Sequence, residues 1–289
     1  MRKKTLGIPA LFLATMIWGT SFVVMKDTLD NIQPLLLLAI RFSMGSLIFA
    51  AVCVKKIKAI DGLYIKYGVL TGILLSSAYI TQTLGLQLTT PGKNAFLTVV
   101  YCIIVPFLCW ITGKKRPDRY NVSAAVICLV GIGLITLEGT LSVNIGDLLT
   151  LASGAIYSVH IIMVKRASAR RPDMSLLTFI QFLTSAVICW CFSPVLGDIN
   201  FSFPVKSWLS VIYLGIMATS LALFLQNYGQ KHTSPSSAAI VLSFEAVFGA
   251  AFSLILGYDS FSAKVIAGFA FMFISVIISE TRLSFLKRR

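Results

Sequence analysis

Long apolar runs separated by short polar segments restrict the fold of this chain more than any other feature of its sequence. About 20 residues of α-helix, each rising about 1.5 Å, cross a hydrocarbon core of about 30 Å. A closed barrel would need shorter segments that alternate between apolar and polar residues, and these runs are continuous. We therefore predict an all-α integral membrane protein with ten transmembrane helices, at about 6–27, 34–54, 64–86, 93–112, 120–138, 146–164, 174–192, 207–228, 235–257 and 264–281.

Composition agrees with this class. Of the 289 residues, 57% are apolar and only 12% are charged, whereas soluble domains are about 45–50% apolar and about 25% charged. In a soluble chain the formal net charge of +14 would suggest a nucleic-acid partner, but here the basic residues lie between the spans. We expect them to fix topology and to contact anionic membrane lipid, and we expect no nucleic-acid partner.

The basic residues also predict the orientation of the chain. With ten spans both termini lie on one side of the membrane, and 20 of the 25 Lys and Arg residues fall on that side. Arg41 falls inside a span, and the four on the other side are Lys26, Lys93, Lys206 and Lys264. Because cytoplasmic loops are enriched in Lys and Arg, we predict a multi-pass protein of the plasma (cytoplasmic) membrane with both termini cytoplasmic.

The two halves of the chain repeat one another. Offsets of 139 to 144 residues relate Trp18 to Tyr157, Lys26 to Lys165, Gln82 to Gln226, and Gly85 to Gly229. Since five helices is an odd number, the two copies enter the membrane in opposite directions. We predict one membrane domain, 1–289, made of two inverted five-helix repeats at about 1–140 and about 145–289. Such repeats are typical of secondary transporters, which bind solute near the midplane and alternate access by rocking.

Short motifs in this order add a family resemblance. They are Trp18-Gly19-Thr20-Ser21-Phe22, Arg41-Phe42, the stretch 89–97, and Glu245-Ala246-Val247-Phe248. Over its whole length the chain resembles the ten-helix, EamA-like branch of the drug/metabolite transporter superfamily. The resemblance implies export or exchange of amino acids and related small metabolites, driven by a proton gradient or down a solute gradient.

One carboxylate, Glu245, lies near the middle of the ninth span. An ionisable group at that depth costs about 2.5–3.5 kcal/mol on insertion scales, so we expect it to face a cavity or a partner. Its role is open between proton coupling, an anchor for a substrate ammonium, and a structural pair with Arg41 or Lys93. Tyr101 is its counterpart in the first repeat, so one carboxyl and one phenol are expected to face the cavity.

Other polar and aromatic side chains within the spans are candidate solute contacts, because lipid cannot satisfy their polar atoms. Amides could line a pore or could hydrogen-bond between helices as packing contacts. Aromatic rings could stack on a flat solute, close over a cation, or only pack. Together with Glu245, the predicted substrate-binding residues are Trp18, Tyr79, Gln82, Tyr101, Tyr157 and Gln226.

Three residues are candidates for other roles. His160 in the sixth span is a second candidate for proton coupling, with an interhelical hydrogen bond as the alternative. Arg41 is near enough to the non-cytoplasmic interface to snorkel, so a structural or gating role is expected, and binding of a substrate carboxylate is the alternative. Pro106 is predicted to break the fourth helix as a gate hinge.

Motifs for enzyme chemistry are missing from the sequence. It has no Walker A loop, no H-E-x-x-H and no G-x-S-x-G, and its six cysteines lack metal-ligand spacing, so we expect no enzyme activity, cofactor or metal. We predict a secondary active transporter that exports or exchanges small metabolites by alternating access. Neutral or aromatic amino acids are the leading predicted substrates, because aromatic residues are expected to line the cavity. Protons are a candidate co-substrate. The alternatives are a lipid-linked or polyanionic carrier flippase and a passive channel; a monomer or weak homodimer is expected.

Overall fold

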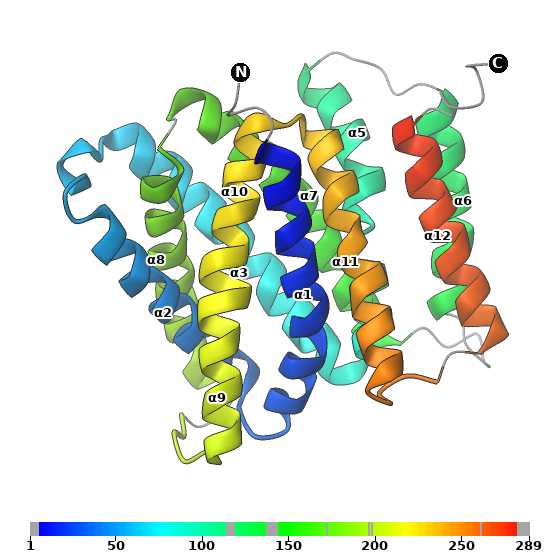
Figure 1. Cartoon of the computed structure of the whole chain (residues 1–289), viewed down its shortest axis with the longest axis horizontal. Coiled ribbons are helices and arrows are strands. Elements are labelled where there is room, and N and C mark those ends of the chain that lie inside the picture. The colour runs from blue at the N-terminus through cyan, green and yellow to red at the C-terminus, as the bar shows by residue number, and fades with distance from the viewer. Residues whose placement is uncertain are drawn as a thin grey trace.

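The computed structural model describes residues 6–113, 119–136, 144–171, 173–195, 197, 199–260 and 262–281. Within these ranges the regular elements are helices, without strands (Figure 1). They are α1 (Gly7–Leu29), α2 (Pro34–Cys53), η2 (Ile57–Ala59), α3 (Gly62–Leu88), α4 (Pro91–Thr98), α5 (Tyr101–Gly113), α6 (Arg119–Thr136), α7 (Ile145–Arg170), α8 (Met174–Phe192), η3 (Ser193–Val195), α9 (Val205–Tyr213), η4 (Leu214–Leu221), α10 (Ala222–His232), α11 (Pro235–Ile255) and α12 (Ala263–Thr281).

The predicted spans all lie on helices, and the all-α membrane fold is confirmed. Eight helical stretches of the described chain are long and apolar enough to cross a bilayer, three of them composite: Pro91–Gly113, Met174–Val195 and Val205–His232. The other two predicted spans are α6 and α12, whose apolar parts, Val122–Leu134 and Ala263–Ser275, are shorter. These two helices pack along each other at one edge of the bundle (Figure 1).

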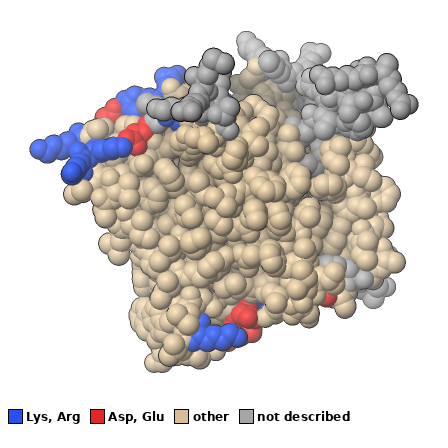
Figure 2. All heavy atoms as spheres, in the orientation of Figure 1, with Lys and Arg blue, Asp and Glu red and all other residues tan. Residues whose placement is uncertain are grey.

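The surface of the bundle is apolar around its middle. Figure 2 shows a face on which the coloured Lys, Arg, Asp and Glu side chains gather towards the two ends. Large apolar side chains such as Leu47, Ile111 and Leu129 are more than half exposed. Such a band is expected of a protein whose middle faces lipid rather than water.

Several helix starts are capped by side chains at equivalent places in the two halves. Thr90 caps α4 and Ser234 caps α11; each accepts a hydrogen bond from a backbone N–H of the first turn, and a proline follows each cap. Gln33 caps α2 and Asp173 caps α8 by the same kind of bond. Such caps satisfy N–H groups that have no partner within the helix, and proline suits the first helical position. The starts of these helices are therefore duplicated in their local chemistry.

Two spans are interrupted. The fourth span divides into α4 and α5 at Val99 and Val100, where Val100 N donates to Leu97 O at 3.3 Å and Cys102 N to Val99 O at 2.9 Å. Pro106 lies inside α5, which continues through it, so the interruption is not at the proline as predicted but before it. The eighth span contains the π-helix η4, a type of segment that is frequent at functional sites.

The helices of the two halves exchange partners in a regular way. α1 packs against α10 and α11, and α7, the first helix of the second half, packs against α3, α4 and α5. α2 packs on α8 as α6 does on α12. The middle of α1 lies very close to α11, because a Cβ added to Gly19 would be 2.2 Å from the Cβ of Phe248. This arrangement brings α1, α3, α4, α7 and α11 together at the centre.

α1 and α7 run in opposite directions. α1 begins beside the end of α10, where Gly7 faces Gly229, and α7 begins beside the end of α3, where Gly146 faces Gly85. A Cβ on Gly229 would lie 2.8 Å from Gly7 O, and a Cβ on Gly85 would lie 2.8 Å from Gly146 O, so both crossings need glycine. The two crossings therefore join equivalent positions of the two halves.

Candidate functional site

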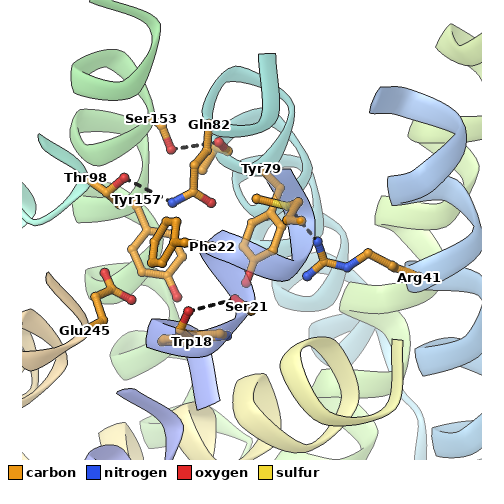
Figure 3. A pocket seen from close by; sticks show the side chains of 12 residues that line it. Trp18, Ser21, Phe22, Arg41, Tyr79, Gln82, Thr98, Ser153, Tyr157 and Glu245 are labelled. Carbon is orange, nitrogen blue, oxygen red and sulfur yellow. Dashed lines mark hydrogen bonds between the residues drawn. The ribbon is translucent and has the colours of Figure 1, made fainter. Parts of the chain in front are cut away.

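A cavity of about 30 Å³ lies at the centre of the bundle (Figure 3). A water molecule needs about 10–15 Å³ of such space, so the cavity has room for about two waters. Its walls come from α1, α2, α3, α4, α7 and α11. The lining residues are Trp18, Ser21, Phe22, Met25, Arg41, Ala78, Tyr79, Gln82, Thr98, Ser153, Tyr157 and Glu245.

Glu245 faces the cavity from α11 and is only 4% exposed. The Tyr101 hydroxyl donates to its Oε1 at 2.9 Å from behind the cavity wall. Tyr101 and Glu245 are counterparts at an offset of 144 residues, and the structure shows that these counterparts contact each other. Within the described chain Glu245 has no ion pair with Arg41 or Lys93, the structural partners considered from the sequence.

Arg41 faces the cavity from α2, on the side opposite Glu245 (Figure 3). It is 2% exposed and therefore does not snorkel to the interface. Its Nε donates to Thr219 Oγ1 at 3.0 Å, its Nη1 to Met25 Sδ at 3.1 Å, and its guanidinium carbon lies 5.6 Å from the centre of the Tyr79 ring. Because a guanidinium keeps its proton in proteins, its charge is buried there, and no carboxylate of the described residues pairs with it.

Aromatic rings and one amide fill the wall between the two charged groups. Trp18 Nε1 donates to Ala218 O at 2.8 Å, and this carbonyl belongs to the π-helix η4, which also supplies Thr219 to Arg41. Gln82 Nε2 donates to Thr98 Oγ1 at 3.0 Å. The irregular turn of η4 therefore supports both the indole and the guanidinium.

The remaining candidates lie outside the cavity. Gln226 Oε1 accepts from the Tyr157 hydroxyl at 2.6 Å, so it is one residue removed from the lining. His160 is fully buried, bonds to Gln181 through its Nε2 at 2.7 Å, and stacks on the Tyr157 ring at 5.1 Å between centroids. Pro106 does not line the cavity either.

Sequence reasoning did not select half of the lining. Ser21, Phe22 and Met25 lie three, four and seven residues after Trp18, and a helical-face argument from Trp18 would have found them. Ser153 lies four residues before Tyr157 and could have been found in the same way. Thr98 carried no signal, because its place depends on the interruption that directly follows it.

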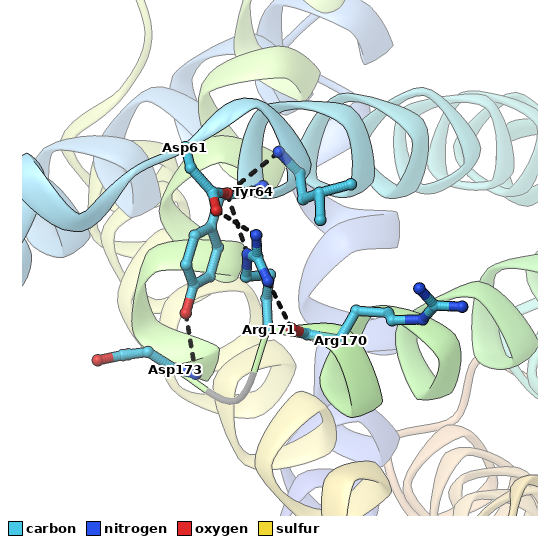
Figure 4. A network of polar contacts seen from close by, with 6 residues as sticks. Asp61, Tyr64, Arg170, Arg171 and Asp173 are labelled. Carbon is cyan, nitrogen blue, oxygen red and sulfur yellow. Dashed lines mark hydrogen bonds and ion pairs between the residues drawn. The ribbon is translucent and has the colours of Figure 1, made fainter.

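A second polar cluster lies at the end of the molecule where α1 begins (Figure 4). Arg171 donates to both carboxylate oxygens of Asp61, and Lys56 Nζ lies 2.9 Å from Asp173 Oδ2. The hydrogen bond from Arg171 lowers the pKa of Asp61. Partial burial alone would raise the pKa of Asp173, but the bond and charge of Lys56 bring it below its usual value. These pairs join the loop after α2 to the loop after α7.

The described chain is thus a helical membrane bundle in which an acidic and a basic side chain face a buried cavity. A model of the EamA-like transporter family matches the chain twice, over residues 5–137 and 144–281. The chain therefore belongs to the EamA-like transporter family, and the predicted drug/metabolite transporter resemblance is confirmed.

Individual relatives are transporters as well. A protein of Archaeoglobus fulgidus described as an uncharacterized transporter is 29% identical over 272 residues, which cover 94% of this chain and 85% of the relative. Solute carrier family 35 member F5 of Macaca fascicularis is 28% identical over 165 residues, which cover 53% of this chain and 37% of the relative. A solved crystal structure, 16% identical, superposes with a TM-score of 0.75 over 97% of this chain and 98% of the other, a likeness of fold.

Proposed function

We propose that this protein is a secondary transporter that exports or exchanges small zwitterionic metabolites, with neutral and aromatic amino acids as the leading class. The observation that carries the proposal is a buried carboxyl group and a buried guanidinium on facing sides of the cavity, those of Glu245 and Arg41 (Figure 3). Neither has an ion-pair partner among the described residues. A solute with one carboxylate and one ammonium compensates both.

Energetics support a ligand for these charges. A buried charge without an opposite charge destabilises a protein by several kcal/mol, because the interior solvates it poorly. Among the described residues the donor to Glu245 is the neutral Tyr101 hydroxyl, and the partners of Arg41 are a hydroxyl, a thioether and a ring face. A bound zwitterion supplies an ion pair at each side, and the Trp18, Tyr79 and Tyr157 rings suit an apolar or flat side chain.

The size of the cavity fits a carrier between its two open states. Space for about two waters is too small for an amino acid, so the bundle must open to admit one. Two matches of one family model and the equivalent glycine crossings support inverted repeats, which open alternately to the two sides. Arg41 is the one basic residue of the lining, so a polyanionic cargo is less well matched.

The proposal is tested by counterflow in proteoliposomes with three probes of one shape. L-phenylalanine carries both charged groups, phenethylamine lacks the carboxylate, and 3-phenylpropionate lacks the ammonium. We expect phenylalanine to exchange at least about tenfold faster than either analogue, because each unpaired charge in the site weakens binding.

Two variants assign the charged groups. Arg41→Gln should slow phenylalanine exchange and leave phenethylamine exchange unchanged, and Glu245→Gln should slow phenylalanine and leave 3-phenylpropionate unchanged. Arg171→Gln, which removes an arginine from the surface cluster, is the matched control and should leave all three rates within twofold. Equal losses for all probes in both variants would refute the assignment, and absence of amino-acid exchange in the wild-type protein would refute the substrate class.

A further inference from the structure

Two lysines occupy equivalent positions at opposite ends of the molecule. Lys26, near the end of α1, donates from Nζ to Leu86 O, Gln87 O and Thr89 O at 2.8, 3.1 and 2.9 Å. Lys165, near the end of α7, donates to Gln230 O and Lys231 O at 3.2 and 3.0 Å. Lys26 thus holds the last turn of α3, and Lys165 holds the last turn of α10.

Each lysine sits beside one of the glycine crossings. At the end held by Lys26, α7 begins against α3 through Gly146 and Gly85; at the end held by Lys165, α1 begins against α10 through Gly7 and Gly229. Three helix termini therefore meet at each end, and α1 and α7 exchange their roles between the ends. α1, α3 and α7 also line the cavity, so the two junctions close the bundle on either side of it.

Buried polar atoms without partners lie between the cavity and Lys165. Among the residues that the structure describes, Gln226 Nε2 and Asn227 Oδ1 have no hydrogen-bond partner, and neither have Oε1 and Nε2 of Gln230, one helical turn further along α10. All three side chains are at most 1% exposed. Unsatisfied polar groups in a dry interior are unfavourable, and such groups are rare in native structures. They fit a passage that is collapsed here and hydrated when it opens.

A polar series of the same kind leads from the cavity towards Lys26. Gln82 bonds to Thr98, both in the lining, and Asn94 Nδ2 donates to Thr150 Oγ1 at 2.7 Å. Asn94 Oδ1 has no hydrogen-bond partner within the described part of the chain, although the residue is fully buried. Thr89, whose carbonyl accepts from Lys26, ends this series; its side chain is buried, and the exposed residues Gln87 and Leu88 directly precede it.

We propose that Lys26 and Lys165 each hold a gate closed, one at each end of a single solute route. In each gate the lysine's hydrogen bonds break when the gate opens, and the two gates open one at a time. The inference deepens the proposed function and rests on its alternating-access mechanism. Both gates are closed in this structure, as the small cavity requires. Release of Lys165 opens the route past Gln230 and Gln226 to the side where α1 begins, and release of Lys26 opens it past Asn94 to the other side.

Helix capping alone is the competing explanation, since a cation beside a helix C-terminus is favourable. Capping predicts that loss of either lysine lowers stability in the same way. Gating predicts opposite changes in access to the cavity. The two explanations are therefore separated by measuring from which side the cavity is reached.

The experiment uses one reporter cysteine in the cavity. Ala78→Cys is introduced after the six native cysteines are replaced, because Ala78 lines the cavity and has no polar side chain to lose. A membrane-impermeant thiol reagent is then applied to right-side-out and to inverted vesicles, and the ratio of the two labelling rates is measured. The assay needs no transported solute, so it can fail or succeed independently of the amino-acid assignment.

Lys165→Met should raise labelling from the side where α1 begins, and Lys26→Met should raise it from the opposite side. Loss of several charged hydrogen bonds should move the ratio about tenfold, with the larger shift for Lys26 because it makes three bonds. The double variant should return the ratio towards that of the parent protein. Lys26→Arg and Lys165→Arg keep a charged donor and should restore the parent ratio. These variants distinguish loss of the gate-closing hydrogen bonds from misfolding.

Lys66→Met and Lys206→Met are matched controls, because they remove exposed lysines at the two ends of the molecule. Neither should change the ratio by more than twofold. The proposal would be overturned if the labelling ratio stayed constant in both Lys26→Met and Lys165→Met, or if it changed in the same direction in both, even if transport were reduced. If the labelling ratios change as expected but no amino acid is exchanged, the gating proposal is supported and the proposed substrate class is refuted.

Discussion

Arg41 and Arg171 have opposite surroundings, and the contrast bears on function. Arg171 donates to both oxygens of Asp61 at a solvent-accessible end of the bundle, where such a pair contributes little to stability. Arg41 is buried beside the cavity without any carboxylate of the described chain, where its charge is most unfavourable. Stability accounts for the surface arginine but not for the buried one. The position of Arg41 is explained if the carboxylate arrives with the solute.

The largest expected effect separates the two arginines directly. Arg41→Met should reduce amino-acid exchange about 100-fold, because a charged contact to substrate is lost, whereas its melting temperature should not fall, because an uncompensated buried charge is removed. Arg171→Met should leave exchange within twofold. Proteoliposome counterflow and thermal unfolding in detergent measure the two quantities. A strong loss of stability in Arg41→Met would mark Arg41 as a structural residue.

A smaller effect is expected on the acidic side of the cavity. Tyr101→Phe removes the hydroxyl that donates to Glu245 and leaves the carboxylate without a described donor. Exchange should fall about tenfold, the size of one charge-assisted hydrogen bond. Tyr64→Phe is the control, because its hydroxyl accepts from Asp173 N in the surface cluster. If both variants exchange at the parent rate, the Tyr101 bond has no part in transport.

The surface pair should matter less still. Asp61→Asn removes the charge that Arg171 contacts, and the free energy of unfolding should decrease only slightly, because solvent screens an exposed ion pair. The difference from the parent protein should shrink at high salt, because exposed ion pairs are screened. Denaturation at low and at high ionic strength measures it. A large decrease in the free energy of unfolding that salt does not alter would show instead that this pair is a main support of the fold.

The smallest effect concerns pH. The pKa values of Asp61 and Asp173 are lowered in the folded protein, so their contribution to stability is present above the unfolded value, about 4, and is lost as the pH falls through that value and below. The melting temperature should therefore decrease on acidification, and less so in the Asp61→Asn, Asp173→Asn double variant. Identical acid profiles for the two proteins would contradict the role assigned to the pairs.

Sequence reasoning found the parts of the cavity that depend on local patterns. Glu245, Arg41 and Gln82 stood out because polar groups at membrane depth need partners, and all three line the cavity. Helix starts at Pro34, Pro91 and Pro235 carry caps and prolines that are readable in the sequence. The repeat offset also identified Tyr101 as the counterpart of Glu245, although their contact required the structure.

Other features depend on contacts that no local pattern encodes. The interruption at Val99 and Val100 has neither glycine nor proline, and the π-helix η4 is visible only through its hydrogen bonds. His160 looked like a titratable cavity group, but the buried amide of Gln181 holds it behind Tyr157. The sequence gives the position of Arg41 along α2 but not the face of the helix on which it lies. Its position alone therefore predicts a side chain near the interface, whereas the structure turns it into the cavity.

The close approach of Gly19 to Phe248 has a mechanical consequence. It places a fulcrum near the middle of α1, a rod whose first residue touches the end of α10 and whose Lys26 touches the end of α3. When a stiff helix tilts about such a point, its two ends move in opposite directions. A tilt that separates one end of α1 from its neighbour therefore presses the other end against its own neighbour. Under the alternating-access mechanism proposed above, this coupling of the two ends of α1 would keep both sides of the cavity from being open at once.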